Sequence, residues 1–183
     1  MEIQIDRIKE LRAQSGAGIM ACRNALLETE GDMGKALQIL KEQSLFKAEE
    51  KSKRLASQGL IETYIHIGGR IGAMVEVNCE SDFVARTDEF KELAHDLAMQ
   101  IAAQDPQFIS KEQIPEEVDI EPETACLLLQ PFIKNPEQTI QDIITEAVAK
   151  VGENIKVTKF ARFELGQAGC RIAELEEGST SSE

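Results

Sequence analysis

The chain has 183 residues, of which 42% are hydrophobic and 29% are charged, and its formal net charge at pH 7 is −13. This composition is typical of a globular protein with a buried core, whereas the acidic excess opposes direct binding to the phosphate backbone of nucleic acids. The residues after Met1 are amphipathic and charged, unlike a secretory signal, and the chain holds no apolar run of about eighteen residues that would predict a membrane span. We therefore expect neither export nor membrane insertion.

The first 48 residues predict three short helices. Apolar residues recur there at intervals of three and four, which is the spacing of one helix face. They are Ile5, Ile8 and Leu11 in the first helix and Met33, Ala36, Leu37 and Leu40 in the third. The glycine-rich SGAG at 15–18 separates the first two helices, and Asp32 lies where an N-cap would begin the third. We expect a three-helix module over residues 1–48, followed by a polar linker over 49–58.

The apolar period changes to two from Leu60 onward, and this alternation predicts two strands. One face of the first strand carries Ile61, Thr63, Ile65 and Ile67. The turn sequence GGR at 68–70 indicates a hairpin. One face of the return strand carries Ile71, Ala73, Val75, Val77 and Cys79.

The remainder of this region predicts two helices and a third strand. Thr87 lies at the N-cap position of a long helix whose apolar stripe repeats every three or four residues. The stripe consists of Phe90, Leu93, Ala94, Leu97, Ala98 and Ile101. After a proline-rich loop at 105–126, Asn135 followed by Pro136 predicts the start of another helix. Residues 155–165 then alternate as a strand.

Together these elements predict an α+β fold. A three-helix bundle precedes a core in which helices pack on one face of a three-stranded antiparallel sheet. We place this core at residues 59–166. Residues 167–183 are acidic and rich in serine, a composition that predicts a disordered tail.

No group of residues predicts catalysis, a metal site or a cofactor. The two histidines, His66 and His95, have no partner at metal-ligand spacing. The glycines at 15–18 are not followed by the GK[ST] signature of a phosphate loop. The four cysteines lack CxxC spacing, which favours reduced thiols, while a disulfide between two chains through Cys126 or Cys170 stays open. An enzyme is therefore not expected.

The stretch NCESDFVART at 78–87 places an aromatic residue in a charged turn. Phe83 lies between Asp82 and Arg86, in a chain with only seven Phe, one Tyr and no Trp. Two interpretations are open. Phe83 packs under the following helix together with Val84, or it protrudes as an anchor for the pocket of a partner protein.

Four segments of the chain resemble the elongation factor Ts family of bacteria and organelles. They are SGAGIMACRNAL (15–26), LIETYIHIGGRIGAMVEVNCESDFVAR (60–86), LLQPFIK (128–134) and VGENIKVTKFARFELG (151–166). Their order and spacing match that family from near Met1 to about Gly166. VNCESDFVAR is the most specific segment, and it carries Ser81 where the family usually has Thr.

The resemblance implies a guanine-nucleotide exchange factor that binds GDP-loaded and nucleotide-free elongation factor Tu. In the family, the segment that here reads Ser81, Asp82, Phe83 and Val84 dislodges Mg²⁺ from the GTPase. The N-terminal module is expected to resemble ubiquitin-associated domains and to contact the partner through Met20 and Arg23. Such a factor works in the cytoplasm, or in the matrix or stroma of an organelle.

The chain also departs from the family pattern. Ala21 and the pair Arg23-Asn24 replace an Asp and a pair of Lys, and a basic helical insert before residue 127 is missing. A second copy of the core and a coiled-coil arm are also missing, and the resemblance implies that short members of the family compensate by pairing two chains, so a homodimer is expected. The alternative function is a protein-binding module whose three helices recognise a partner without nucleotide exchange.

Overall fold

The structure is a computed structural model that describes residues 4–167 and 169–175. The chain forms two compact units. The first consists of Met1–Arg54 together with Thr145–Asn154, and the second of Leu55–Ile144 together with Ile155–Glu183. Each unit has its own fold and is described separately.

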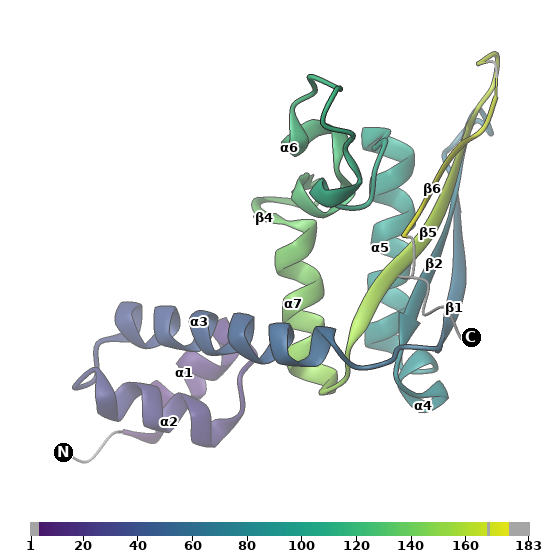
Figure 1. The fold of residues 1–183 in the computed structure, drawn as a ribbon. Coiled ribbons are helices and arrows are strands. Elements are labelled where there is room, and N and C mark those ends of the chain that lie inside the picture. The colour runs from purple at the N-terminus through teal and green to yellow at the C-terminus, as the bar shows by residue number, and fades with distance from the viewer. Residues whose placement is uncertain (1–3, 168, 176–183) are drawn as a thin grey trace, which may run out of the picture. The chain divides into compact units, whose positions relative to one another are not determined.

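The N-terminal part of the first unit is a bundle of three helices, α1 (Ile5–Ser15), α2 (Ile19–Glu28) and α3 (Met33–Ser52) (Figure 1). The buried core of this bundle contains Leu11, Cys22, Ala25, Leu26, Ala36 and Leu40. Asp32 caps α3 as predicted, because its carboxylate accepts a hydrogen bond from the Lys35 backbone N–H at 3.0 Å. The helix runs on to Ser52, so the first residues of the linker predicted at 49–58 are helical.

Residues Thr145–Asn154 complete the first unit and hold the end of α3. Lys51 Nζ donates to the Val148 carbonyl at 3.3 Å. The buried Asn154 side chain donates to the carbonyls of Ser52 and Arg54 at 3.3 and 2.8 Å. A segment distant in sequence therefore satisfies the last carbonyl groups of this helix.

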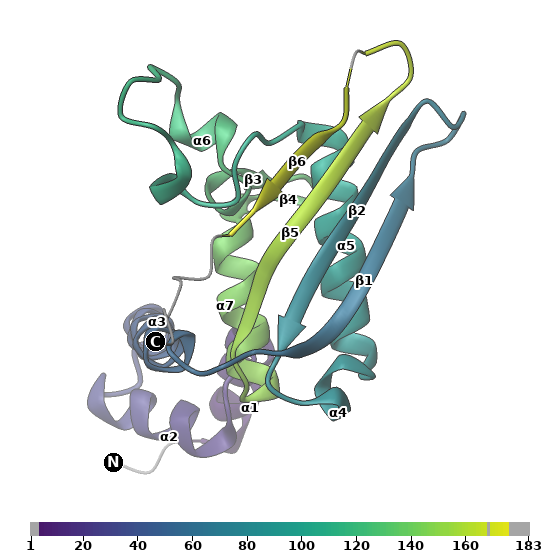
Figure 2. The ribbon, with the colours of Figure 1, turned by 45° about the vertical axis from the view of Figure 1, so that its right-hand side comes forward.

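The second unit is built on a four-stranded antiparallel sheet with the order β1-β2-β5-β6 (Figure 2). The strands are β1 (Gln58–Ile65), β2 (Ile71–Cys79), β5 (Ile155–Glu164) and β6 (Arg171–Glu174). Three of these strands were predicted and the fourth was not. The prediction of a disordered tail over 167–183 is wrong for residues 171–174, which form β6, and residues 176–183 lie outside the described part of the chain.

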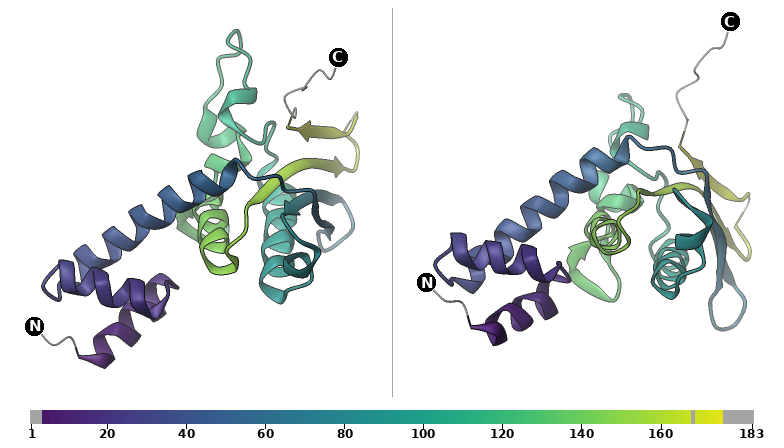
Figure 3. Two further views of the ribbon diagram at one scale, coloured as in Figure 1. Left: turned by 60° about the horizontal axis from the view of Figure 1, so that its bottom comes forward. Right: turned by 90° about the horizontal axis from the view of Figure 1, so that it is seen from below.

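Helix α5 (Asp88–Gln104) covers one face of this sheet (Figure 3). Every residue of its predicted apolar stripe is buried. Thr87 caps the helix as predicted, since its hydroxyl accepts a hydrogen bond from the Phe90 N–H. The same face of the sheet contributes Val75, Val77 and Phe160 to the core.

The other face of the sheet is open to solvent and largely apolar. Tyr64 of β1 lies opposite the buried Ala73, whereas Thr63 lies opposite the exposed Met74. The isoleucines of β1 share the face of Thr63, so they lie on the side away from α5. The exposed apolar residues of this open face are Ile61, Ile65, Met74, Phe163 and Ile172. In the described part of the second unit, no helix covers them (Figure 3).

The segment between α5 and α7 (Ile140–Val151) contains only short elements. They are a 3₁₀ turn at Lys111–Gln113, α6 (Pro122–Ala125), a 3₁₀ turn at Leu127–Leu129, β3 (Pro131–Phe132) and β4 (Asn135–Thr139). The prediction that Asn135 caps a helix is wrong, because Asn135 pairs with Phe132 in a small hairpin. Helix α7 begins five residues later. There the Thr139 backbone N–H donates to the Asp142 carboxylate, and the Asp142 backbone N–H donates to the Thr139 hydroxyl.

The predicted α+β class is therefore confirmed, with a bundle of N-terminal helices followed by helices packed on an antiparallel sheet. No helix of the described residues has the length and apolar character needed to cross a membrane.

Candidate functional site

The candidate site is the turn that joins β2 to α5. It contains one short helix, α4 (Asp82–Ala85), which packs against β1 and β2 at one end of the sheet (Figures 1 and 2). Within this helix Val84 is 6% exposed and Ala85 is 8% exposed, whereas Phe83 is 78% exposed. Of the two interpretations of the sequence, the structure favours the protruding aromatic.

Side-chain hydrogen bonds fix the backbone of this turn. The buried thiol of Cys79 donates to the Ser81 carbonyl at 3.1 Å. Ser81 is the N-cap of α4, and its hydroxyl accepts from the Val84 N–H at 3.4 Å. The Thr87 hydroxyl donates to the Val84 carbonyl at 2.8 Å. The predicted residues Ser81, Asp82, Phe83 and Val84 thus form one compact turn with the aromatic ring outermost.

The charges beside Phe83 form an ion pair. Arg86 Nη2 lies 2.7 Å from Asp82 Oδ2, and both side chains are largely exposed. A pair at this spacing on a helix brings the two groups to the same side of the backbone. The exposed ring is therefore accompanied by one acidic and one basic group.

The second predicted contact lies on the first unit, at the start of α2. Met20 is 61% exposed and Arg23 is also exposed, while the intervening Cys22 is buried in the bundle core. Ile19 adds a further exposed apolar side chain. These residues form an accessible patch with one positive charge.

The described residues offer no candidate metal centre. No cluster of three or more His, Cys, Asp or Glu is arranged there to hold a metal ion. The ring centroids of His66 and His95 lie 6.1 and 5.8 Å from the ring centroid of Tyr64. His95 Nδ1 is 3.5 Å from Glu62 Oε1. The sequence analysis missed this cluster of rings because Tyr64 lies on β1, His66 follows that strand and His95 lies on α5.

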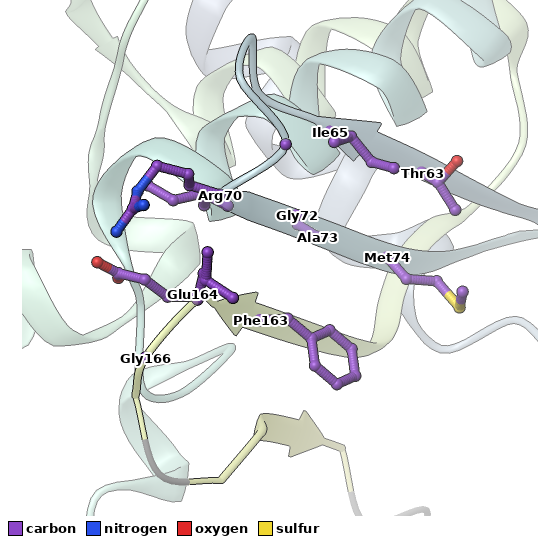
Figure 4. Close-up of a pocket in the computed structure, with 12 residues that line it drawn as sticks. Thr63, Ile65, Arg70, Gly72, Ala73, Met74, Phe163, Glu164 and Gly166 are labelled. Atoms are coloured by element: carbon purple, nitrogen blue, oxygen red, sulfur yellow. The ribbon is translucent and has the colours of Figure 1, made fainter.

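A hollow of about 560 Å³ lies on the open face of the sheet (Figure 4). Its lining comes from three strands and includes Ile65, Met74 and Phe163. The alternation of β1 already placed its isoleucines on one face, but sequence alone did not indicate that this face lies away from α5.

Comparisons with a family model and with individual known proteins point to the same family. The chain matches the family model described as Elongation factor TS over residues 24–125 and 121–167. The Elongation factor Ts of Heliobacterium modesticaldum is 48% identical in an alignment that covers 87% of this chain and 88% of that protein. That of Carboxydothermus hydrogenoformans is 47% identical, with 87% and 88% covered. That of Thermotoga neapolitana is 42% identical, with 92% and 100% covered.

These matches place the chain among the translation elongation factors. Within that class it belongs to the elongation factor Ts family. Strand β6 lies beyond residue 167, where the match to the family model ends.

Proposed function

We propose that the chain is a guanine-nucleotide exchange factor for elongation factor Tu. It binds the GDP-loaded GTPase, displaces Mg²⁺ and promotes release of GDP so that GTP can bind. The observation that carries this proposal is the exposure of Phe83 on a turn whose backbone is held by hydrogen bonds of the Ser81 hydroxyl before it and the Thr87 hydroxyl after it. Membership of the elongation factor Ts family supports it. The reaction takes place where the GTPase works, in the cytoplasm or in an organelle.

Exchange of this kind makes and breaks no covalent bond, so the chain acts as a binding protein and not as an enzyme. A factor that binds the nucleotide-free GTPase more tightly than the loaded one weakens nucleotide binding by the same ratio. An acceleration of about a thousandfold corresponds to about 4 kcal/mol. Burial of one Phe side chain contributes on the order of 1.5–3 kcal/mol. Phe83 therefore supplies much of the difference, and other contacts supply the rest.

The four residues of the turn have different roles in this proposal. Phe83 enters the partner beside its Mg²⁺ and phosphate site, and Ser81 and Val84 hold the turn that presents it. Asp82 opposes the phosphate charge or competes for the donors around it. Once Mg²⁺ has left, the phosphate charges are less compensated, so a small displacement has a large effect on nucleotide affinity.

The test is the release of a fluorescent GDP analogue from elongation factor Tu. We expect the wild-type chain to accelerate release and Phe83→Ala to lose most of this acceleration without unfolding. Phe46→Ala is the matched control, because Phe46 is a similarly exposed aromatic residue on α3. Equal rates for wild type and Phe83→Ala would contradict the proposed role of Phe83. If wild type binds the GTPase but does not accelerate release, the chain is a binding module without exchange activity.

The N-terminal module docks on the GTPase through Met20 and Arg23 in this proposal. The exposure of both side chains on α2 supports it. We expect the double variant Met20→Ala/Arg23→Ala to weaken complex formation while release at saturating factor stays close to wild type. Titration calorimetry measures the first quantity and stopped-flow fluorescence the second. Unchanged affinity would rule out this docking site.

We further propose that two copies of the chain pair through the open face of the sheet. Five exposed apolar residues lie on this face, and packing of two sheets face to face would bury them. At one end of the face Glu76 lies opposite Lys159 on the neighbouring strand. A two-fold axis along the strands, between β2 and β5, would lay Glu76 of one copy over Lys159 of the second copy.

Sedimentation equilibrium tests this pairing. We expect Phe163→Asp to shift the proposed dimer to a monomer, because it places a charge on the apolar face beside Ile65 and Met74. Phe46→Asp adds the same charge to the first unit and should leave the dimer intact. A wild-type chain that stays monomeric at high concentration would contradict the pairing.

A further inference from the structure

Thr87 links the exposed turn to the long helix that follows it. Its hydroxyl donates to the Val84 carbonyl at 2.8 Å and accepts from the Phe90 N–H at 3.3 Å. Its backbone N–H also points to the Val84 carbonyl, at 3.0 Å. The hydroxyl therefore donates its single hydrogen to the turn and accepts a hydrogen bond from the helix through a lone pair.

Val84 is the residue through which the turn is held. Its backbone N–H donates a hydrogen bond to the Ser81 hydroxyl, and its carbonyl accepts one from the Thr87 hydroxyl. Its side chain is buried. Phe83 directly precedes it and exposes most of its side chain. A ring with so much exposed surface has few contacts to orient it, so its direction depends on the backbone of the turn.

The other end of the Thr87 bridge is rigid. Phe90 is 1% exposed, and α5 packs along its whole apolar stripe against the sheet. Thr87 is thus the point at which the turn is tied to the most deeply packed helix of the second unit. Capping alone would need only an acceptor at this position, because the N–H groups of the first helical turn are donors.

We propose that Thr87 is a positioning residue for nucleotide exchange, in that its hydroxyl hydrogen bond to the Val84 carbonyl holds Phe83 in the orientation that enters the partner. This inference rests on the proposed exchange function. Thr87 itself touches neither nucleotide nor metal. Loss of the bond lets the turn rotate, so the ring reaches the partner site less often in the productive geometry.

Three substitutions separate positioning from helix capping. Thr87→Ser keeps a hydroxyl and both hydrogen bonds. Thr87→Val keeps the shape and loses both. Thr87→Asp keeps an acceptor that caps α5 but has no hydrogen for the Val84 carbonyl at neutral pH. The matched control is Thr139→Val, which removes the equivalent hydroxyl from the start of α7, where it accepts from the Asp142 N–H at 3.1 Å.

The experiment measures GDP release from elongation factor Tu over a range of factor concentrations, with thermal unfolding of each variant. We expect the maximal release rate to fall about tenfold for Thr87→Val and Thr87→Asp, and the half-saturating concentration to stay within about twofold. Thr87→Ser should recover most of the wild-type rate. Thr87→Asp should melt close to wild type, because α5 is still capped.

Each outcome decides whether Thr87 positions Phe83 for exchange. A wild-type maximal rate for Thr87→Asp would overturn the inference, since the hydroxyl would then act only as a cap. An equal loss of rate for Thr139→Val would also overturn it, because the effect would be general destabilisation. If the wild-type chain does not accelerate GDP release, the proposed exchange function fails. If wild type and Phe83→Ala accelerate release equally, the role of Phe83 fails and the role of Thr87 fails with it. If Phe83→Ala is inactive and Thr87→Val is fully active, only the role of Thr87 fails.

Discussion

Asp82 and Arg86 form an ion pair of 2.7 Å on the turn that exposes Phe83. The aromatic residue is therefore accompanied by a neutral pair and not by a free carboxylate. An exposed pair at this spacing adds about 0.5 kcal/mol or less to stability. Its main effect is on the net charge of the surface next to Phe83.

Removal of Arg86 tests this effect. Under the proposed function the turn approaches a phosphate-rich site, so Arg86→Ala leaves an unpaired negative charge that is repelled. We expect kcat/KM for GDP release to fall a few fold at low salt, and the difference from wild type to shrink at about 0.5 M salt, where the Debye length is short. Stopped-flow measurements over a salt series provide the comparison.

The control for this experiment is Arg70→Ala. Arg70 is exposed in the hairpin turn at the other end of β2, so its removal changes the net charge equally. It should leave the salt dependence of exchange unchanged. A similar loss in both variants would show that total charge, and not the pair beside Phe83, sets the association rate.

Truncation of two phenylalanines three residues apart on β5 should change the free energy of unfolding by very different amounts. Phe160 is 1% exposed and faces α5, whereas Phe163 is 57% exposed on the open face. We expect Phe160→Ala to reduce the free energy of unfolding by about 3–5 kcal/mol. Phe163→Ala should change it by about 0.5 kcal/mol or less at low protein concentration, where the chain is monomeric. Urea unfolding measures both, and equal losses would contradict the assigned faces.

The cap of α3 should make the first unit sensitive to acid. A hydrogen bond from the Lys35 backbone N–H, aided by the charge of Lys35, holds the pKa of Asp32 below its ordinary value of 3.8. A carboxyl group whose pKa is lower in the folded state stabilises the fold above its unfolded pKa, and this contribution is lost as the pH falls through its folded pKa. Asp32→Ala should therefore lower the melting temperature at pH 7 and have little effect well below pH 3.8.

Circular dichroism melts at a series of pH values test this prediction. Asp6→Ala is the control, because Asp6 lies in the first turn of α1 but does not cap it. A constant difference between Asp32→Ala and wild type at all pH values would show that the carboxylate is not the stabilising group.

The cysteines should differ sharply in reactivity. Cys22, Cys79 and Cys126 are buried, and Cys170 is partly exposed. Burial is the main cause that raises the pKa of the Cys126 thiol, and the charges of Glu112 and Glu123 act in the same direction, so less of it is thiolate at pH 8. We expect one thiol per folded chain to react quickly with a disulfide reagent and the other three to react only on unfolding. Rapid reaction of Cys126 would contradict its burial, and a disulfide between chains is open only to Cys170 among the four.

The sequence predicted the long helices and two of the three helix caps correctly, and Asn135 is the cap that it misplaced. The stripe of α5 and the caps Asp32 and Thr87 follow from local spacing and local hydrogen bonding, which depend on neighbours three or four residues away. For Phe83 the sequence left two orientations open. Its exposure depends on how Val84 packs against the sheet, which local pattern does not determine.

Strand β6 and the hairpin at 131–139 were missed because tertiary contacts form them. Arg171 Nε lies 2.9 Å from Asp105 Oδ1, and Lys159 Nζ lies 2.9 Å from Glu174 Oε2. These ion pairs join β6 to residues far away in sequence. The hairpin is held by the buried Gln100, which donates to the Pro131 carbonyl and accepts from the Ile133 N–H. Neither set of partners can be recognised within a short window of sequence.

The discontinuous first unit has a consequence for synthesis of the chain. Its N-terminal helices leave the ribosome first, but the residues that bond the end of α3, from Thr145 to Asn154, are made only after most of the second unit. During translation the carbonyls of Ser52 and Arg54 therefore lack their hydrogen bonds from the Asn154 side chain until Asn154 has been synthesised. The N-terminal helices can form early, yet their unit reaches its final hydrogen bonding only after residues 145–154 have been synthesised.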